Sequence, residues 1–91
     1  MNVAWQRIYR RENDAGEVTI EYAPEGSIHT FKDLDVRIQS RKRAIPHANG
    51  SGVWFHTSYF VIVIGKYETE FWSLREAKAA AERIIFAEER A

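Results

Sequence analysis

Histidine is the side chain in this sequence best suited to bind a metal or to transfer protons near neutral pH. His29, His47 and His56 lie in separate segments of the 91-residue chain. No helical or turn spacing brings two of them together, as a metal-binding pair would require. A lone histidine on a strand is more often a half-buried polar residue than a ligand. We therefore expect neither a metal nor another cofactor.

Nucleophiles and carboxylates also lack a catalytic context. Ser51 and Ser58 do not follow the strand–turn–helix pattern of an activated serine. The stretch "NGSG" is rich in glycine, but it lacks the lysine and the following helix of a phosphate-binding loop. Asp33 and Asp35 are two residues apart near an expected strand, and this arrangement does not make a shared acid–base site. The sequence predicts a protein that is not an enzyme.

Composition restricts the partner and the compartment. Lys plus Arg and Asp plus Glu each number 13, so no net field attracts a polyanion, although local patches could act. The chain has no cysteine, which removes disulfides and thiolate ligands and favours a reducing, cytoplasmic location. The N-terminus has no secretion signal, and the longest apolar run, residues 59–64, is too short to span a bilayer. We expect no membrane partner.

Alternation of apolar and polar residues predicts strands in the N-terminal half. Residues 18–22, "VTIEY", follow this pattern, and residues 3–10 are their expected partner. The turn between them falls at 13–16, "NDAG", whose residues tolerate positive φ. Residues 34–38, "LDVRI", predict a third strand, with a short strand near 28–31 before it.

These elements predict a single α+β domain. Its antiparallel sheet, a meander of five or six strands, should pack against one C-terminal helix. The N-terminal strands occupy residues 1–40, a polar surface loop occupies residues 41–52, and a β-hairpin followed by the helix occupies residues 53–89.

The C-terminal hairpin has a turn signal at Gly65 and Lys66, which suits a two-residue type II′ loop. Ile64 would then lie opposite Tyr67, and this register assigns every side chain to a face. The predicted apolar face consists of Phe60, Ile62, Ile64, Tyr67 and Phe71. The predicted opposite face consists of Tyr59, Val61, Val63, Glu68, Glu70 and Trp72.

The helix begins with a capping box, because Ser73 is followed three residues later by Glu76. Its apolar stripe consists of Leu74, Ala77, Ala80, Ala81, Ile84 and Ile85. We expect this stripe to pack on the face that contains Phe60. Phe86 points away from the stripe and should lie either beneath the N-terminal strands or in solvent.

The stretch "GVWFHTSYFVIVIGKYETEFWSLREAKAAAERI" resembles the AP2 and integrase arm-type DNA-binding domains, in which three strands precede a helix. The similarity covers residues 52–87 and lies in the Gly-Lys hairpin, the aromatic end of the third strand and the helix start "SLREAKAA". In that family the sheet face turned away from the helix reads the major groove with Arg and Lys. The matching positions here include Glu68 and Glu70, which would repel phosphates. DNA binding is therefore the alternative hypothesis, through basic residues at strand ends and in the loop: Arg10, Arg11, Arg41, Lys42 and Arg43.

Aromatic residues favour a protein partner, because Tyr and Trp carry much of the energy of protein interfaces. The predicted contact surface consists of Tyr59, Val61, Val63, Glu68, Glu70, Trp72 and Phe86. This surface could instead be covered by the N-terminal strands, or it could form a homodimer. In size and organisation the chain also resembles small accessory proteins of phages and mobile elements, including anti-CRISPR inhibitors, which implies inhibition by occupying a partner's surface.

Overall fold

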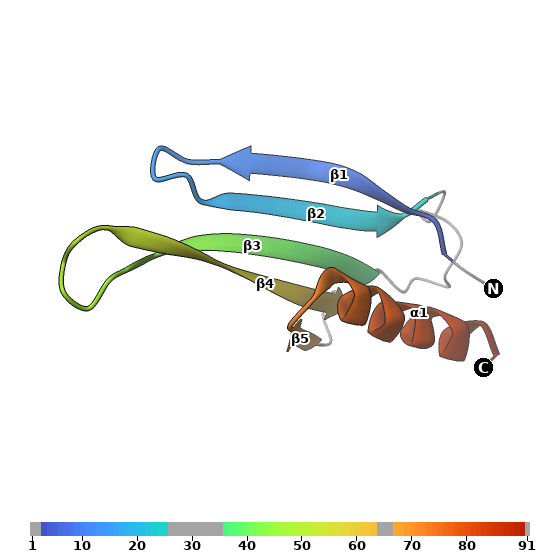
Figure 1. The fold of residues 1–91 in the computed structure, drawn as a ribbon. Coiled ribbons are helices and arrows are strands. Elements are labelled where there is room, and N and C mark those ends of the chain that lie inside the picture. The colour runs from blue at the N-terminus through green and yellow to red at the C-terminus, as the bar shows by residue number, and fades with distance from the viewer. Residues whose placement is uncertain (1–2, 26–35, 64–66, 91) are drawn as a thin grey trace.

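A computed structural model describes residues 3–25, 36–63 and 67–90, and within them it contains five strands and one helix (Figure 1). The elements are β1 (Trp5–Glu12), β2 (Val18–Pro24), β3 (Val36–Pro46), β4 (Val53–Val63), β5 (Tyr67–Phe71) and α1 (Leu74–Arg90). The strands form one antiparallel sheet in the order β1-β2-β3-β4-β5. The predicted α+β meander with a C-terminal helix is confirmed. The short strand expected near residues 28–31 lies outside the described residues.

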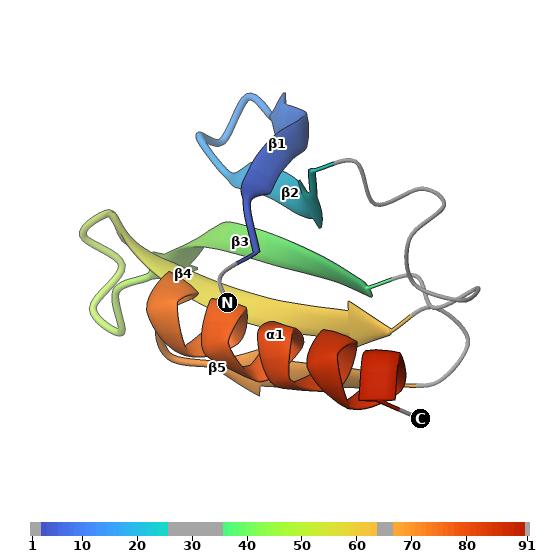
Figure 2. The same cartoon turned by 90° about the vertical axis from the view of Figure 1, so that its right-hand side faces the viewer.

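The helix covers one face of the sheet (Figure 2). The first hairpin, β1 and β2, extends the sheet sideways and turns out of the plane of β3, β4 and β5. It therefore does not cover the second face, and the alternative in which the N-terminal strands do so is wrong. We call the face turned away from α1 the open face.

The first hairpin is closed by side-chain contacts in its turn. The Asn13 carboxamide oxygen accepts hydrogen bonds from the N–H groups of Ala15 and Glu17, each at 3.0 Å. Gly16 has a φ of +80°, a conformation that favours glycine. A Cβ atom at Gly16 would also lie 3.3 Å from the Phe55 ring of β4. The glycine thus allows both the turn and a close approach by β4.

The basic segment that follows the first hairpin differs from its prediction. β3 continues to Pro46, so residues 41–46 are strand and only 47–52 form the turn. The prediction of a surface loop over 41–52 is wrong for its first half. Alternation fails here because α1 does not reach this part of the sheet, and cations can therefore occupy both faces. The turn closes with a hydrogen bond from the His47 N–H to the Gly52 carbonyl oxygen at 3.0 Å.

The register of the C-terminal hairpin is also offset by one residue from the prediction. Val63, rather than Ile64, lies opposite Tyr67. The connection spans 64–66, outside the described residues, and is one residue longer than a type II′ turn. A one-residue offset moves every side chain of a strand to the other face. Val61 and Val63 therefore face α1, and the prediction that Phe60 and Ile62 do so is wrong.

The core lies between α1 and the inner parts of β3 and β4. The apolar stripe of the helix is confirmed, because Ala77, Ala81 and Ile85 are fully buried. The small alanine side chains let the helix approach the valines of β4 closely. The buried cluster consists of Val36, Ile38, Val61, Val63, Ala77, Ala80, Ala81 and Ile85.

Two polar contacts fix the ends of these elements. The Ser73 hydroxyl accepts a hydrogen bond from the Glu76 N–H at 3.1 Å, which confirms the predicted cap. The Trp5 indole N–H donates to the Glu82 carboxylate at 3.0 Å and connects the start of β1 to the helix. Phe86 is half-buried and packs against the core.

The far end of the β3–β4 hairpin projects beyond the rest of the sheet. β2 pairs with β3 only as far as Lys42, and β5 pairs with β4 only from Tyr59 onward. We call residues 43–46 of β3 and 53–58 of β4, with the turn between them, the outer ribbon. Figure 1 shows its turn at the end of the sheet opposite α1, and the molecule measures 52 × 24 × 20 Å. In the described part of the chain, no helix is long and apolar enough to cross a membrane.

Candidate functional site

Among the described side chains with catalytic potential, His56 and Ser58 line one small hollow, whereas His47 and Ser51 lie in the β3–β4 turn. His47 is exposed in the β3–β4 turn, and His56 is half-buried on β4. Ser51 donates a hydrogen bond to the Asn49 side chain at 2.7 Å within that turn. Among the described residues, no three His, Asp or Glu side chains cluster as metal ligands. His29 lies outside the described residues, as do both aspartates considered for acid–base chemistry.

Arginines line the open face along β3. The alternation that buries Val36 and Ile38 against α1 places Arg37, Arg41 and Arg43 on the open face. The sequence predicts these basic residues at strand ends or in a loop, because its alternation ends the third strand at residue 38. This row of arginines is therefore not predicted. The open face therefore carries the cations that a groove-reading sheet requires, together with carboxylates.

The carboxylates of β5 lie beside the arginine row. The Arg41 guanidinium forms an ion pair with the Glu68 carboxylate at 3.0 Å, and it stacks 4.0 Å from the centroid of the Phe60 ring. Glu70 is exposed and lies opposite Phe60 in the register. A half-exposed ion pair of this kind contributes about 0–1 kcal/mol to stability. Its larger effect is to give this part of the open face both signs of charge.

The predicted protein-contact surface divides between the two sheet faces. Val61 and Val63 are buried beneath the helix, and Tyr59 is half-buried against the same core. Their expected exposure is wrong, because the offset in register turns them toward α1. Glu68 and Glu70 are exposed on the open face. The remaining two members of that surface differ, since Trp72 is 85% exposed and Phe86 packs on the core.

The outer ribbon exposes apolar side chains that sequence reasoning missed. Val53, Trp54 and Phe55 are 53%, 45% and 41% exposed. They are consecutive, so they point alternately to the two faces of the ribbon. The sequence did contain a signal for this exposure: the apolar run "VWF" directly after a glycine-containing turn. Three consecutive residues of a strand cannot all point to one covered face, so at least one of them must point to the other face. The Trp54 ring meets His56 edge to face at a centroid distance of 6.0 Å.

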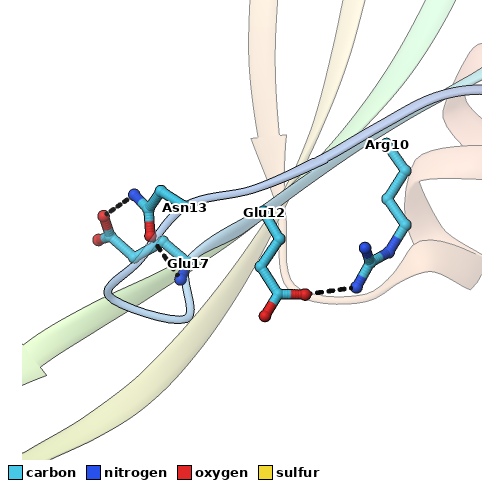
Figure 3. A network of polar contacts seen from close by, with 4 residues as sticks. All are labelled: Arg10, Glu12, Asn13 and Glu17. Atoms are coloured by element: carbon cyan, nitrogen blue, oxygen red, sulfur yellow. Dashed lines mark hydrogen bonds and ion pairs between the residues drawn. The ribbon is translucent and has the colours of Figure 1, made fainter.

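The turn of the first hairpin supports the outer ribbon. The Glu17 carboxylate accepts a hydrogen bond from the Ala44 N–H of β3 at 3.0 Å. It also accepts one from the Asn13 carboxamide at 2.9 Å (Figure 3). The hydrogen bond from Asn13 is the largest of the causes that lower the pKa of Glu17 below its ordinary 4.5. The hydrogen bond from Ala44 and the charge of Arg43 lower this pKa further. The same figure shows the exposed Arg10–Glu12 ion pair at 2.9 Å.

A hollow of about 140 Å³ lies where the outer ribbon meets the end of β5. Its lining residues are His56, Thr57, Ser58, Glu70, Phe71 and Trp72. Pockets for small molecules usually measure about 300–1,000 Å³, so this hollow suits a single side chain better than a ligand. It brings the exposed Trp72 next to the outer ribbon.

The basic residues of the DNA hypothesis also divide between the two faces. Arg11 and Arg43 line one shallow pocket on the open face, where Arg43 donates to the Thr19 hydroxyl at 3.2 Å. Arg41 lies on the same face. Lys42 points to the opposite face, where its ammonium group lies 4.6 Å from the centroid of the Phe55 ring. Arg10 shares that opposite face, because it pairs in register with Ile20.

Charge is segregated along the chain despite the overall neutrality. The β3–β4 hairpin, residues 36–63, carries four cations and no carboxylate. The cations are Arg37, Arg41, Lys42 and Arg43. Of these cations only Arg43 lies in the outer ribbon, the other three lie on the adjoining part of β3, and the compensating acids lie elsewhere. Comparison with family models, curated proteins and solved structures finds no match to this chain.

Proposed function

We propose that this protein is a non-enzymatic binding module whose partner is another protein, contacted through the outer ribbon and Trp72. The observation that carries the proposal is the exposure of Val53, Trp54 and Phe55 on a projecting two-stranded ribbon. Large apolar side chains held on strands lose little conformational freedom when they bind. Aromatic residues so placed are common anchors of protein interfaces.

The mixed charge of the open face supports a protein partner. Arginines on β3 and carboxylates on β5 share this face, and Arg41 is already paired with Glu68. Protein interfaces use both signs of charge to fix orientation. A duplex lying across the same strands would bring its phosphates against Glu68 and Glu70, which are both exposed.

Duplex DNA is the second candidate, and the absence of carboxylates from residues 36–63 favours it. A two-stranded β-ribbon fits the major groove, and its arginines can contact phosphates or base edges. This alternative agrees with the resemblance to AP2 and integrase arm-type domains. It requires contact through the outer ribbon rather than across the whole sheet.

A titration with short duplex DNA at low and at moderate salt distinguishes the two candidates. The protein-binding hypothesis predicts no binding at low salt. Binding with a steep salt dependence would contradict it, provided that the triple change Arg41→Gln, Lys42→Gln and Arg43→Gln abolishes binding. The matched control neutralises three helix cations instead, with Arg75→Gln, Lys78→Gln and Arg83→Gln. It should leave binding unchanged if the ribbon is the contact.

Such a module could act by occupying a surface of its partner and so inhibiting it. Inhibitors of this kind include the phage and mobile-element proteins that the chain resembles in size, and a cysteine-free chain suits a cytoplasmic target. Self-association is the competing use of the same aromatic residues. Sedimentation analysis of the wild type and of Trp72→Ser separates the two, because a homodimer through Trp72 would dissociate in the variant.

A further inference from the structure

Among the described residues the sheet has four free edges of four or more residues, and three of them are protected against pairing with another strand. β1 is interrupted by a bulge between Arg7 and Tyr9 and carries charged side chains. β5 is short and carries Glu68 and Glu70. Bulges, short strands and charges are the usual means of preventing edge-to-edge association.

The outer edge of β3 is the third protected stretch. Its residues 43–46 include Arg43 and Pro46, and the Glu17 side chain already occupies the Ala44 N–H at 3.0 Å. Proline and charge both disfavour an added strand. The first hairpin thus covers part of this edge.

The fourth stretch, residues 53–58 of β4, has none of these protections. β5 ends opposite Tyr59, and no described residue pairs with 53–58 on the side away from β3. The segment reads "VWFHTS", with no Asp, Glu, Lys, Arg, Pro or Gly, and the register with β3 shows no bulge. Valine, aromatic residues and threonine are favourable strand residues. This is the part of the sheet best suited to accept another strand.

The surroundings of this edge supply contacts for side chains as well as for backbone. Trp54 and His56 flank it on the open face, and Phe55 flanks it on the other. The hollow beside Trp72 lies at its inner end, in line with β5. In strand addition the backbone hydrogen bonds give affinity, and pockets for alternate side chains give specificity. Here residues 53–58 have no described strand partner on this side, and the hollow beside Trp72 offers one pocket.

Charge determines what kind of strand fits. Lys42 and Arg43 lie on β3 next to this edge, and the hairpin that bears them has no carboxylate. A second copy of the protein would bring its own Lys42 and Arg43 to the junction and would be repelled. An extended segment that contains Asp or Glu would be attracted instead.

We propose that residues 53–58 of β4 receive an extended, acidic segment of a partner protein as a sixth strand of the sheet. The inference rests on the protein-binding function proposed above and specifies its geometry. The partner segment pairs with the β4 backbone, places its aromatic or β-branched residues beside Trp54 and Phe55, and inserts one side chain into the hollow beside Trp72.

The test uses the full-length protein and a library of random linear peptides, followed by synthesis of the enriched sequences. We expect enriched peptides in which Asp or Glu alternates with β-branched or aromatic residues. In hydrogen-exchange measurements, they should slow exchange of the 53–58 amides selectively. The change Trp54→Glu, which adds a carboxylate to this edge, should weaken binding by about tenfold or more. The control Ile8→Glu adds the same charge to the β1 edge at a 46% exposed position and should leave binding unchanged.

Three results would overturn the inference: no enriched peptide, enriched peptides that leave the 53–58 amides unprotected, or equal binding to both variants. Peptides that bind elsewhere would refute the added strand while leaving the protein-binding function intact. Failure of all peptides together with salt-dependent duplex binding would refute both. A dimer that protects residues 53–58 without any peptide would also overturn the choice of partner. If Trp54→Glu does not fold, His56→Glu places the charge on the same edge and face.

Discussion

The register of β4 can be tested by exchanging valine for threonine at Val61. Threonine has nearly the same shape and the same preference for strands, so Val61→Thr changes little except the burial of a hydroxyl group. Val61 is fully buried beneath α1. Burying a hydroxyl without a hydrogen-bond partner costs roughly 1–3 kcal/mol in protein mutational data. In a domain of this size each kcal/mol lowers the melting temperature by about 4–8 °C, so the expected decrease is about 4–24 °C.

The control is the neighbouring residue, Ile62, which is half-buried on the open face. Ile62→Thr should cost less than about 1 kcal/mol, since part of its side chain already contacts water. Thermal unfolding followed by circular dichroism, with urea unfolding as a second measurement, gives both differences. A larger loss for Ile62→Thr than for Val61→Thr would refute the register and restore the pairing of Ile64 with Tyr67.

Two further predictions concern polar contacts. Ser73→Ala should lower stability by about 1 kcal/mol, because the Glu76 N–H loses its acceptor. The control Ser73→Asp should preserve stability, since aspartate can also accept this hydrogen bond. Equal melting temperatures for the wild type and Ser73→Ala would contradict the cap. Because the pKa of Glu17 is lowered in the folded state, its charge stabilises the protein above pH 4.5, and this contribution is lost as the pH falls through the folded-state pKa. The difference in melting temperature between wild type and Glu17→Gln should therefore be greatest near neutral pH and become smaller below pH 4.5. A difference that stays constant from pH 7 to pH 3 would contradict this prediction.

The parts of the fold that could be predicted from the sequence depend on local signals. Alternation in "VTIEY" identified the second strand, and the residues before it that tolerate positive φ, among them Gly16, identified its turn. Ser73 and the alanines after it identified the helix, its start and its buried stripe. Each of these signals comes from residues within a turn or two of one another, so no knowledge of the rest of the fold was needed.

The errors arose where the outcome depends on distant elements. Residues 60–64, "FVIVI", are apolar throughout, so their pattern does not show which face meets the helix. The length of the connection at 64–66 decides the register, and a Gly-Lys pair does not fix that length. The basic end of β3 lacks alternation because α1 does not reach it. Trp54 and Phe55 are exposed because the outer ribbon projects beyond the rest of the sheet. The outer ribbon could not be recognised until β3 was known to extend to Pro46.

The narrow junction between β2 and β3 affects how the molecule opens. The first hairpin joins the remaining strands along residues 18–22, and the core cluster contains none of its side chains. Its other contacts are the packing of Trp5 and Tyr22 against the edge of that cluster, the hydrogen bonds Trp5–Glu82, Glu17–Ala44 and Arg43–Thr19, and the approach of Gly16 to Phe55. Local opening has the lowest free energy where few buried apolar contacts must break. The first hairpin should therefore be the part that detaches first, and limited digestion by a protease should cut there before it reaches β3, β4 or the helix.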